Sequence, residues 1–173
     1  GNASDLEKLQ PSVNAGASNT SWFGPEFGLA VRWMRETTSG NLFIHKEATS
    51  GAPISSFDLS VWPGSDKLFR AVTGALPWIA SHGYTLSARH CLWVQGESNS
   101  GDSQSSYQAA LGDILTGLHT GGMLTTDSRS VLAQMKVGSS GYGVGPFDAK
   151  AALAAADPSH VSTIQMDYYQ GDN

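Results

Sequence analysis

Hydrophobic and polar residues alternate with distinct periods along this chain. Apolar residues recur at helical spacing in some segments, which predicts helices over residues 25–39, 65–76, 106–119 and 147–156. Short apolar runs predict strands over residues 41–48, 89–95, 130–137 and 161–169. Pro77 is expected to kink or restart the second helix. Because helices alternate with single strands, we expect one α/β domain over residues 1–173, a three-layer α/β/α sandwich whose mostly parallel sheet is covered on both faces.

The carboxyl ends of parallel strands are where open α/β sheets bind their ligands. The polar residues that follow the predicted strands are therefore the first candidates for a functional site. They fall at residues 47–51, 95–99, 138–145 and 170–173. The glycine-rich segment 138–145 lacks the Gly-Lys-Ser/Thr ending of a phosphate loop, so we interpret it as a flexible wall of the site.

Composition narrows the classes of partner. The chain has 173 residues and 18.2 kDa, with 10 Lys and Arg against 15 Asp and Glu and a net charge of −5. This balance argues against a nucleic-acid partner and against an anionic membrane surface, since both need clustered basic residues. The apolar runs are too short to span a bilayer. The single cysteine, Cys91, excludes an internal disulfide and a cysteine-based zinc site.

The most specific string in the chain is Trp-Val-Gln-Gly-Glu-Ser-Asn at residues 93–99. A buried strand that ends abruptly in amide, carboxylate and hydroxyl groups would place hydrogen-bonding groups at the rim of an apolar pocket. Preorganised dipoles stabilise developing charge most strongly in such surroundings. The alternative is a polar turn that leads into the next helix, although a turn has no need of Gln and Glu beside its glycine.

This string resembles the third sequence block of the SGNH-type carbohydrate esterases, the group of sialate O-acetylesterases and of acetylxylan esterases of carbohydrate esterase family six. Two further strings are similar to that family: Phe-Gly-Pro-Glu-Phe-Gly-Leu-Ala at 23–30 and Lys-Glu-Ala-Thr-Ser-Gly at 46–51. The resemblance covers residues 22–173 and implies an SGNH hydrolase-like, flavodoxin-like fold. It also implies a serine esterase that removes O-acetyl groups from a saccharide, without a metal or an organic cofactor.

The family's chemistry assigns roles to residues of this chain. A serine attacks the acetyl carbonyl, a histidine moves the proton, and an aspartate three residues before that histidine orients it. By resemblance, the amide of Gln95 and the backbone N–H of Gly51 hold the oxyanion, and Asp172 is the orienting aspartate. Glu97 would orient Gln95 or a loop, would support the histidine, or would cap nearby N–H groups. We expect the saccharide to contact a set of residues around them: Trp62, Gly96, Asn99 and Tyr142.

The nucleophile has several candidates. The family's Gly-Gln-Ser-Asn string is absent, and Gly-Ala-Ser-Asn around Ser18 is closest to it in letters, although no apolar strand precedes it. Ser98 follows a buried strand and imitates a nucleophile elbow, except that Ser100 replaces the closing glycine. Ser103 stands in a Gly-Asp-Ser string, but its place before a helix favours an N-cap.

The histidine has no convincing candidate. The family's last block is Asp-x-x-His, so a histidine paired with Asp172 would fall beyond Asn173. None of the five histidines replaces it, because each lies near a helix end or within or beside a strand. The resemblance therefore implies that a first strand with the nucleophile and a last segment with the histidine are absent from residues 1–173. A complete chain of this kind would be inactive or would borrow strands from elsewhere.

Three functions follow from these expectations, and the third, besides the two described next, is a different serine hydrolase that uses Ser98. The first is a carbohydrate O-acetylesterase, whose partner is an acetylated saccharide and which binds neither nucleic acid nor a membrane. The second is a non-catalytic saccharide-binding module on the same fold. A basic region followed by an apolar stretch is missing at the start, so a signal peptide is absent or already removed. We expect a secreted or extracellular location rather than a cytoplasmic one, and the sugar and the oligomeric state stay open.

Overall fold

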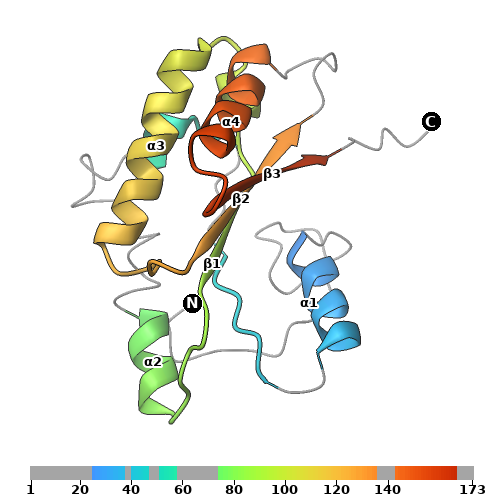
Figure 1. Cartoon of the computed structure of the whole chain (residues 1–173), viewed down its shortest axis with the longest axis vertical. Coiled ribbons are helices and arrows are strands. Elements are labelled where there is room, and N and C mark those ends of the chain that lie inside the picture. Colours follow the sequence, from blue (N-terminus) through green and yellow to red (C-terminus); the bar gives the residue numbers. More distant parts are fainter. Residues whose placement is uncertain (1–24, 38–39, 47–50, 58–73, 136–142, 167–173) are drawn as a thin grey trace.

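The computed structural model describes residues 25–37, 40–46, 51–57, 74–135 and 143–166 (Figure 1). The helices are α1 (Pro25–Glu36), α2 (Leu76–Ser81), α3 (Gln104–Thr120) and α4 (Val144–Ala156), with short 3-10 helices η1 (Ile54–Phe57) and η4 (Glu97–Asn99). The strands are β1 (His90–Trp93), β2 (Arg129–Met135) and β3 (Val161–Met166). Within these ranges, no helix has the length and apolar character needed to cross a bilayer.

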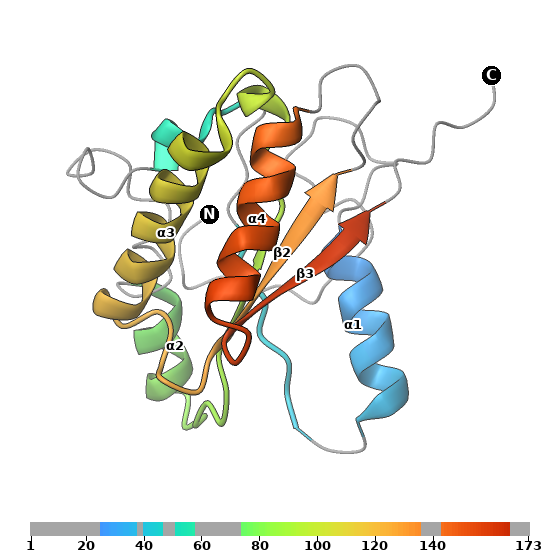
Figure 2. The same ribbon diagram turned by 45° about the horizontal axis from the view of Figure 1, so that its top comes forward.

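The three strands form a parallel sheet in the order β1-β2-β3. Helix α3 connects β1 to β2, and α4 connects β2 to β3, so both crossovers step across the sheet in the same direction. Crossovers of one hand that step the same way place their helices on the same face. Figure 2 shows α3 and α4 side by side there. The predicted α/β class with a parallel sheet is confirmed.

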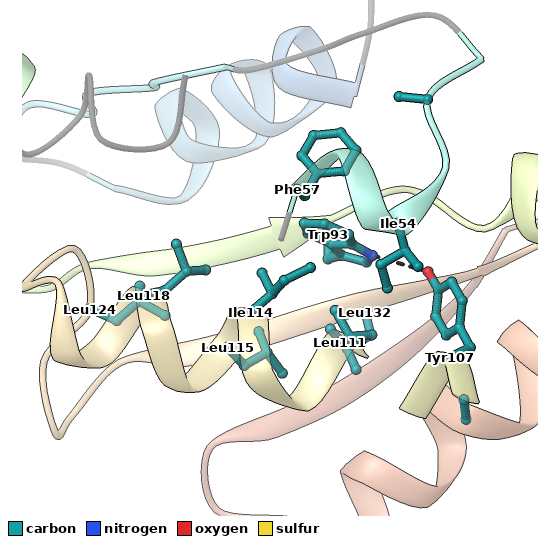
Figure 3. Packing of buried hydrophobic residues seen from close by; sticks show 12 residues of the cluster. Ile54, Phe57, Trp93, Tyr107, Leu111, Ile114, Leu115, Leu118, Leu124 and Leu132 are labelled. Carbon is teal, nitrogen blue, oxygen red and sulfur yellow. Dashed lines mark hydrogen bonds between the residues drawn. The ribbon is translucent and has the colours of Figure 1, made fainter. Parts of the chain in front are cut away.

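The core fills the space between α3 and the sheet (Figure 3). One stripe of α3 points inward because its apolar residues recur every three or four positions, and it consists of Tyr107, Leu111, Ile114, Leu115 and Leu118. Trp93 of β1 and Leu132 of β2, which are register partners, meet this stripe from the sheet. Burying a side chain of this size contributes about 1.5–3 kcal/mol to the stability of the fold. Helix α3, with five such residues in the core, therefore contributes strongly to that stability.

The opposite face of the sheet is less covered. Leu92 and Ile164 point to that side, and 43% and 50% of their surfaces are exposed. Figures 1 and 2 place α1 across the strands from α4, yet its Leu29 and Met34 are largely exposed as well. The described residues therefore show one helical layer packed on the sheet, where the sequence predicts helices covering both faces.

The sequence prediction is wrong for the strand over residues 41–48, as far as the structure describes it. Residues 41–46 are irregular, and residues 47–48 lie outside the described ranges. Phe43 packs its ring edge-on against Tyr84, with ring centroids 5.2 Å apart, instead of joining β1 in the sheet. The helix predicted over residues 65–76 falls mostly outside the description, and Pro77 lies in the first turn of α2, where a proline is tolerated.

Candidate functional site

The turn after β1 is joined to the segment that follows Gly51. Gln95 donates from Nε2 to the carbonyl oxygen of Ala52 at 3.1 Å and to Oδ1 of Asn99 at 2.6 Å. The same Asn99 oxygen accepts the backbone N–H of Ile54 at 2.8 Å. Segments more than forty residues apart in the chain are thereby held together beside the carboxyl end of β1. Gln95 and Asn99 are both buried.

Tyr107 of α3 fixes the orientation of the Gln95 amide. Its hydroxyl lies 2.7 Å from Oε1 of Gln95 and 3.0 Å from the Gln95 carbonyl oxygen, and it accepts Nε1–H of Trp93 at 3.3 Å (Figure 3). Burial raises the pKa of Tyr107 well above its ordinary value, so the phenol stays protonated and remains a donor. With Oε1 turned to the phenol, the Nε2 group of Gln95 must face Ala52 and Asn99.

The side chain of Lys150, on α4, contacts the same turn. Its Nζ donates to the carbonyl oxygen of Gln95 and, at 2.6 Å, to that of Ala133 in β2. Burial lowers the pKa of Lys150 to about 8, while the negative charge of Glu97 acts in the opposite direction. The half-buried Glu97 thus contributes through its charge, whereas Gln95 is oriented by Tyr107 and Asn99.

Glycines permit the close approach of these backbones. Gly96 has φ +149°, and a Cβ there would lie 3.3 Å from Lys150 Nζ and 3.3 Å from Pro146 Cβ. A Cβ on Gly143 would meet the carbonyl oxygen of Ser100 at 2.0 Å. The start of α4 therefore docks directly on the turn after η4. This contact determines where α4, and with it Lys150, lies under the site.

The structure brings together a subset of the expected site residues: Gly51, Gln95, Gly96, Glu97 and Asn99. In this arrangement both N–H groups of Gln95 are donated to protein acceptors, so a ligand oxyanion would have to take one of them from its present partner. Asn99 likewise serves the protein, since its Nδ2 donates to Asp102 Oδ2 at 2.7 Å. The other candidates lie outside the described residues: Ser18, Trp62, Tyr142 and Asp172.

The structure places several of the candidate serines and histidines. Ser103 is the N-cap of α3 and accepts the backbone N–H of Ser106 at 3.2 Å, which confirms the expected capping role. Ser98 is exposed on η4. His90 opens β1 and His160 directly precedes β3, so both lie at the amino edge of the sheet, opposite Gln95.

Within the described ranges, the structure supports neither a cysteine nucleophile nor a metal site. Burial raises the pKa of the Cys91 thiol to about 11, which leaves it protonated at neutral pH and a poor nucleophile. Among the residues that the structure describes, no group of three His, Cys, Asp or Glu side chains is placed to hold a metal ion.

Sequence reasoning missed the roles of Tyr107 and Lys150. The sequence pattern places Tyr107 in the apolar stripe of α3 and gives no partner for its hydroxyl. Lys150 stands in an alanine-rich helix, in register with the buried residues Pro146 and Ala149. A lysine at an inward position of such a helix is the signal that could have identified it, because an unpaired buried ammonium is costly.

Comparisons with known proteins identify no relative: neither a family model, nor a curated protein, nor a solved structure matches this chain.

Proposed function

We propose that this protein is a serine esterase that removes O-acetyl groups from a carbohydrate, with a Ser-His-Asp mechanism on an SGNH hydrolase-like fold. The observation that supports the proposal most is the bond between Gln95 and Ala52. It brings the side-chain amide of Gln95 into the same neighbourhood as the main chain at Gly51, beside the carboxyl end of β1. Side-chain amides and backbone N–H groups are the donors that stabilise a tetrahedral oxyanion.

In the proposed mechanism, Gly51 supplies a backbone donor and Gln95 a side-chain donor. Gly51 adopts φ +67°, a conformation that glycine takes without strain, so the turn presents its main chain with no side chain over it. The oxyanion replaces the carbonyl of Ala52 as acceptor of one Gln95 N–H. The Ala52 carbonyl has to move aside in this exchange, while Asn99 and Tyr107 still hold the Gln95 amide in place.

The remaining roles follow the family resemblance alone. The nucleophile is a serine, for which Ser18 and Ser98 are the candidates, and Asp172 orients the histidine that takes the proton. Water then attacks the acetyl-enzyme and releases acetate. The saccharide is held beside the Gln95–Asn99 turn, where Trp62 and Tyr142 are the proposed stacking partners of a sugar ring.

A specific observation favours a second candidate, a non-catalytic saccharide-binding module on the same fold. Three of the histidines lie at the far edge of the sheet, at the start of β1, at the end of α3 and just before β3: His90, His119 and His160. In addition, the amides of Gln95 and Asn99 already have protein partners. Such a module would bind an acetylated saccharide without turnover.

Acetate release separates these candidates. The complete gene product is incubated with p-nitrophenyl acetate, acetylated xylan and O-acetylated sialic acid, and acetate is measured. The esterase proposal expects turnover that falls about 100-fold or more in Q95A, the loss typical of removing one oxyanion donor. Q165A, which changes an exposed glutamine of β3, serves as the matched control. Binding of acetylated xylan without acetate release supports the module, and neither activity contradicts both proposals.

A further inference from the structure

Lys150 is a buried cation at the proposed site that the esterase mechanism leaves without a role. Its side chain is only 1% exposed. The ammonium donates to the carbonyl oxygens of Gln95, which follows β1, and of Ala133, which lies in β2. One side chain of α4 therefore joins the two neighbouring strands at their carboxyl ends, directly beneath the turn that carries the Gln95 amide.

The charge of this lysine has no direct counterion in the described part of the chain, where no carboxylate lies at ion-pair distance from Nζ. Two neutral carbonyls satisfy hydrogen bonds but do not cancel a full charge, and burying such a charge is costly. A methionine of similar length would fill the same space without this penalty. A lysine at this position is explained if its charge or its donors serve the turn above it.

The ammonium also lies against the backbone of the turn. A Cβ on Gly96 would come within 3.3 Å of Nζ, so the chain passes directly over the charge. The ionisable groups around Nζ are Glu97 on η4 and Tyr107 on α3, whose ring centroid is 5.8 Å from Nζ. Asp102 acts on Tyr107 in turn. At their contacts with Nζ, the turn after β1 and strand β2 present backbone carbonyls.

We propose that Lys150 is a positioning residue: its ammonium clamps the Gln95–Gly96 turn onto β2 and keeps a positive potential under the place where negative charge develops. The catalytic consequence rests on the proposed esterase function, whereas the clamp does not. A neutral amine still has two N–H donors, so deprotonation preserves the contacts and removes the potential. Methionine removes both, and arginine keeps the charge without titrating near neutral pH.

The first experiment needs no enzymatic activity. The backbone amide signal of Gly96 is followed by ¹⁵N NMR between pH 6 and 10 in the wild type, K150R and R129M. Because burial lowers the pKa of Lys150 to about 8, the wild-type signal should shift with a midpoint near that pH. K150R should abolish the shift, and R129M, which alters an exposed arginine at the amino edge of β2, should retain it. A shift that persists in K150R, or a wild-type signal that does not move, overturns the positive potential under the turn. The clamp itself is tested with K150M, which loses both hydrogen bonds of Nζ, and a Gly96 amide that exchanges its proton no faster in K150M than in R129M overturns it.

The second experiment measures the kinetic consequence. Acetate release by K150M should show a kcat about tenfold below that of R129M with a KM within about twofold, since the lost interaction acts in the transition state. The wild-type kcat should decline above pH 8, where Lys150 loses its proton, whereas K150R should recover part of kcat and show no such decline. A K150M kcat equal to that of R129M overturns the catalytic role. If the wild type releases no acetate, the esterase proposal fails, and the Gly96 measurements alone decide whether the clamp exists.

Discussion

Nε2 of Gln95 donates to Oδ1 of Asn99 at 2.6 Å, and this bond closes the turn between β1 and α3 upon itself. Two residues outside the turn also hold it in place. The N–H of Ile54 donates to Asn99 Oδ1, and the hydroxyl of Tyr107 donates to Gln95 Oε1. The polar groups that the sequence singles out as a candidate site are therefore held by the protein before any ligand arrives. Such preorganisation is what a site for developing charge requires.

Asn99 is expected to be essential for stability. N99A removes the acceptor of both Ile54 N–H and Gln95 Nε2–H and leaves buried donors unsatisfied. Each unsatisfied group costs about 1–3 kcal/mol, so the free energy of unfolding should fall by about 2–4 kcal/mol. Urea unfolding measures the change. N41A, at an exposed asparagine, should stay within about 0.5 kcal/mol of the wild type. Equal stability of the two variants would contradict this account of Asn99.

Tyr107→Phe tests the orientation of Gln95. The variant keeps the buried ring but removes the hydroxyl that meets Gln95 Oε1 and Trp93 Nε1. The loss should be about 1–3 kcal/mol, because both partners are left unpaired in the core. Y84F is the matched control, since Tyr84 is 43% exposed. Thermal unfolding of both variants gives the comparison, and a Y107F melting temperature equal to that of Y84F would show that the hydroxyl does not hold the site.

A side chain at Gly96 should destabilise the protein. G96A combines a φ of +149° with contacts of 3.3 Å to Lys150 Nζ and Pro146 Cβ, whereas G122A has φ +77° and no atom within 4 Å of its new Cβ. Backbone strain costs about 1–3 kcal/mol at either position, and crowding adds to it only at Gly96. We therefore expect G96A to be the less stable variant in chemical denaturation. A larger loss in G122A would mean that the turn at Gly96 is not packed as described.

The buried ammonium predicts a specific pH dependence of stability. Burial lowers the pKa of Lys150 from 10.5 to about 8, so the folded protein binds fewer protons than the unfolded chain between these values. Below pH 8 both states carry the proton, and the full penalty of burying the charge applies. As the pH rises from 8 to 10.5, the wild type should gain up to about 3 kcal/mol of unfolding free energy relative to K150M. A difference that stays constant across this range would show that Lys150 is not buried as a cation.

Local pattern was sufficient to predict α3 and β2, because an apolar stripe or a compact apolar run repeats over enough residues to stand out. It failed for residues 41–46, where a short apolar run pairs with none of the strands in the described part of the chain. It could not reveal the bonds of Gln95, since Ala52 lies 43 positions away and Lys150 lies 55 positions away. Such contacts depend on how the elements pack, which the spacing of residue types does not encode.

The central claim is that a serine beside the Gln95 turn attacks an ester. A fluorophosphonate probe tests it most directly, because the probe bonds covalently to an activated serine, and peptide mapping by mass spectrometry then locates it. We predict one probe per molecule of the complete gene product, attached at a single serine, with labelling slowed in Q95A and unchanged in Q165A. Absence of labelling, under conditions in which a known serine esterase reacts fully, would contradict the account.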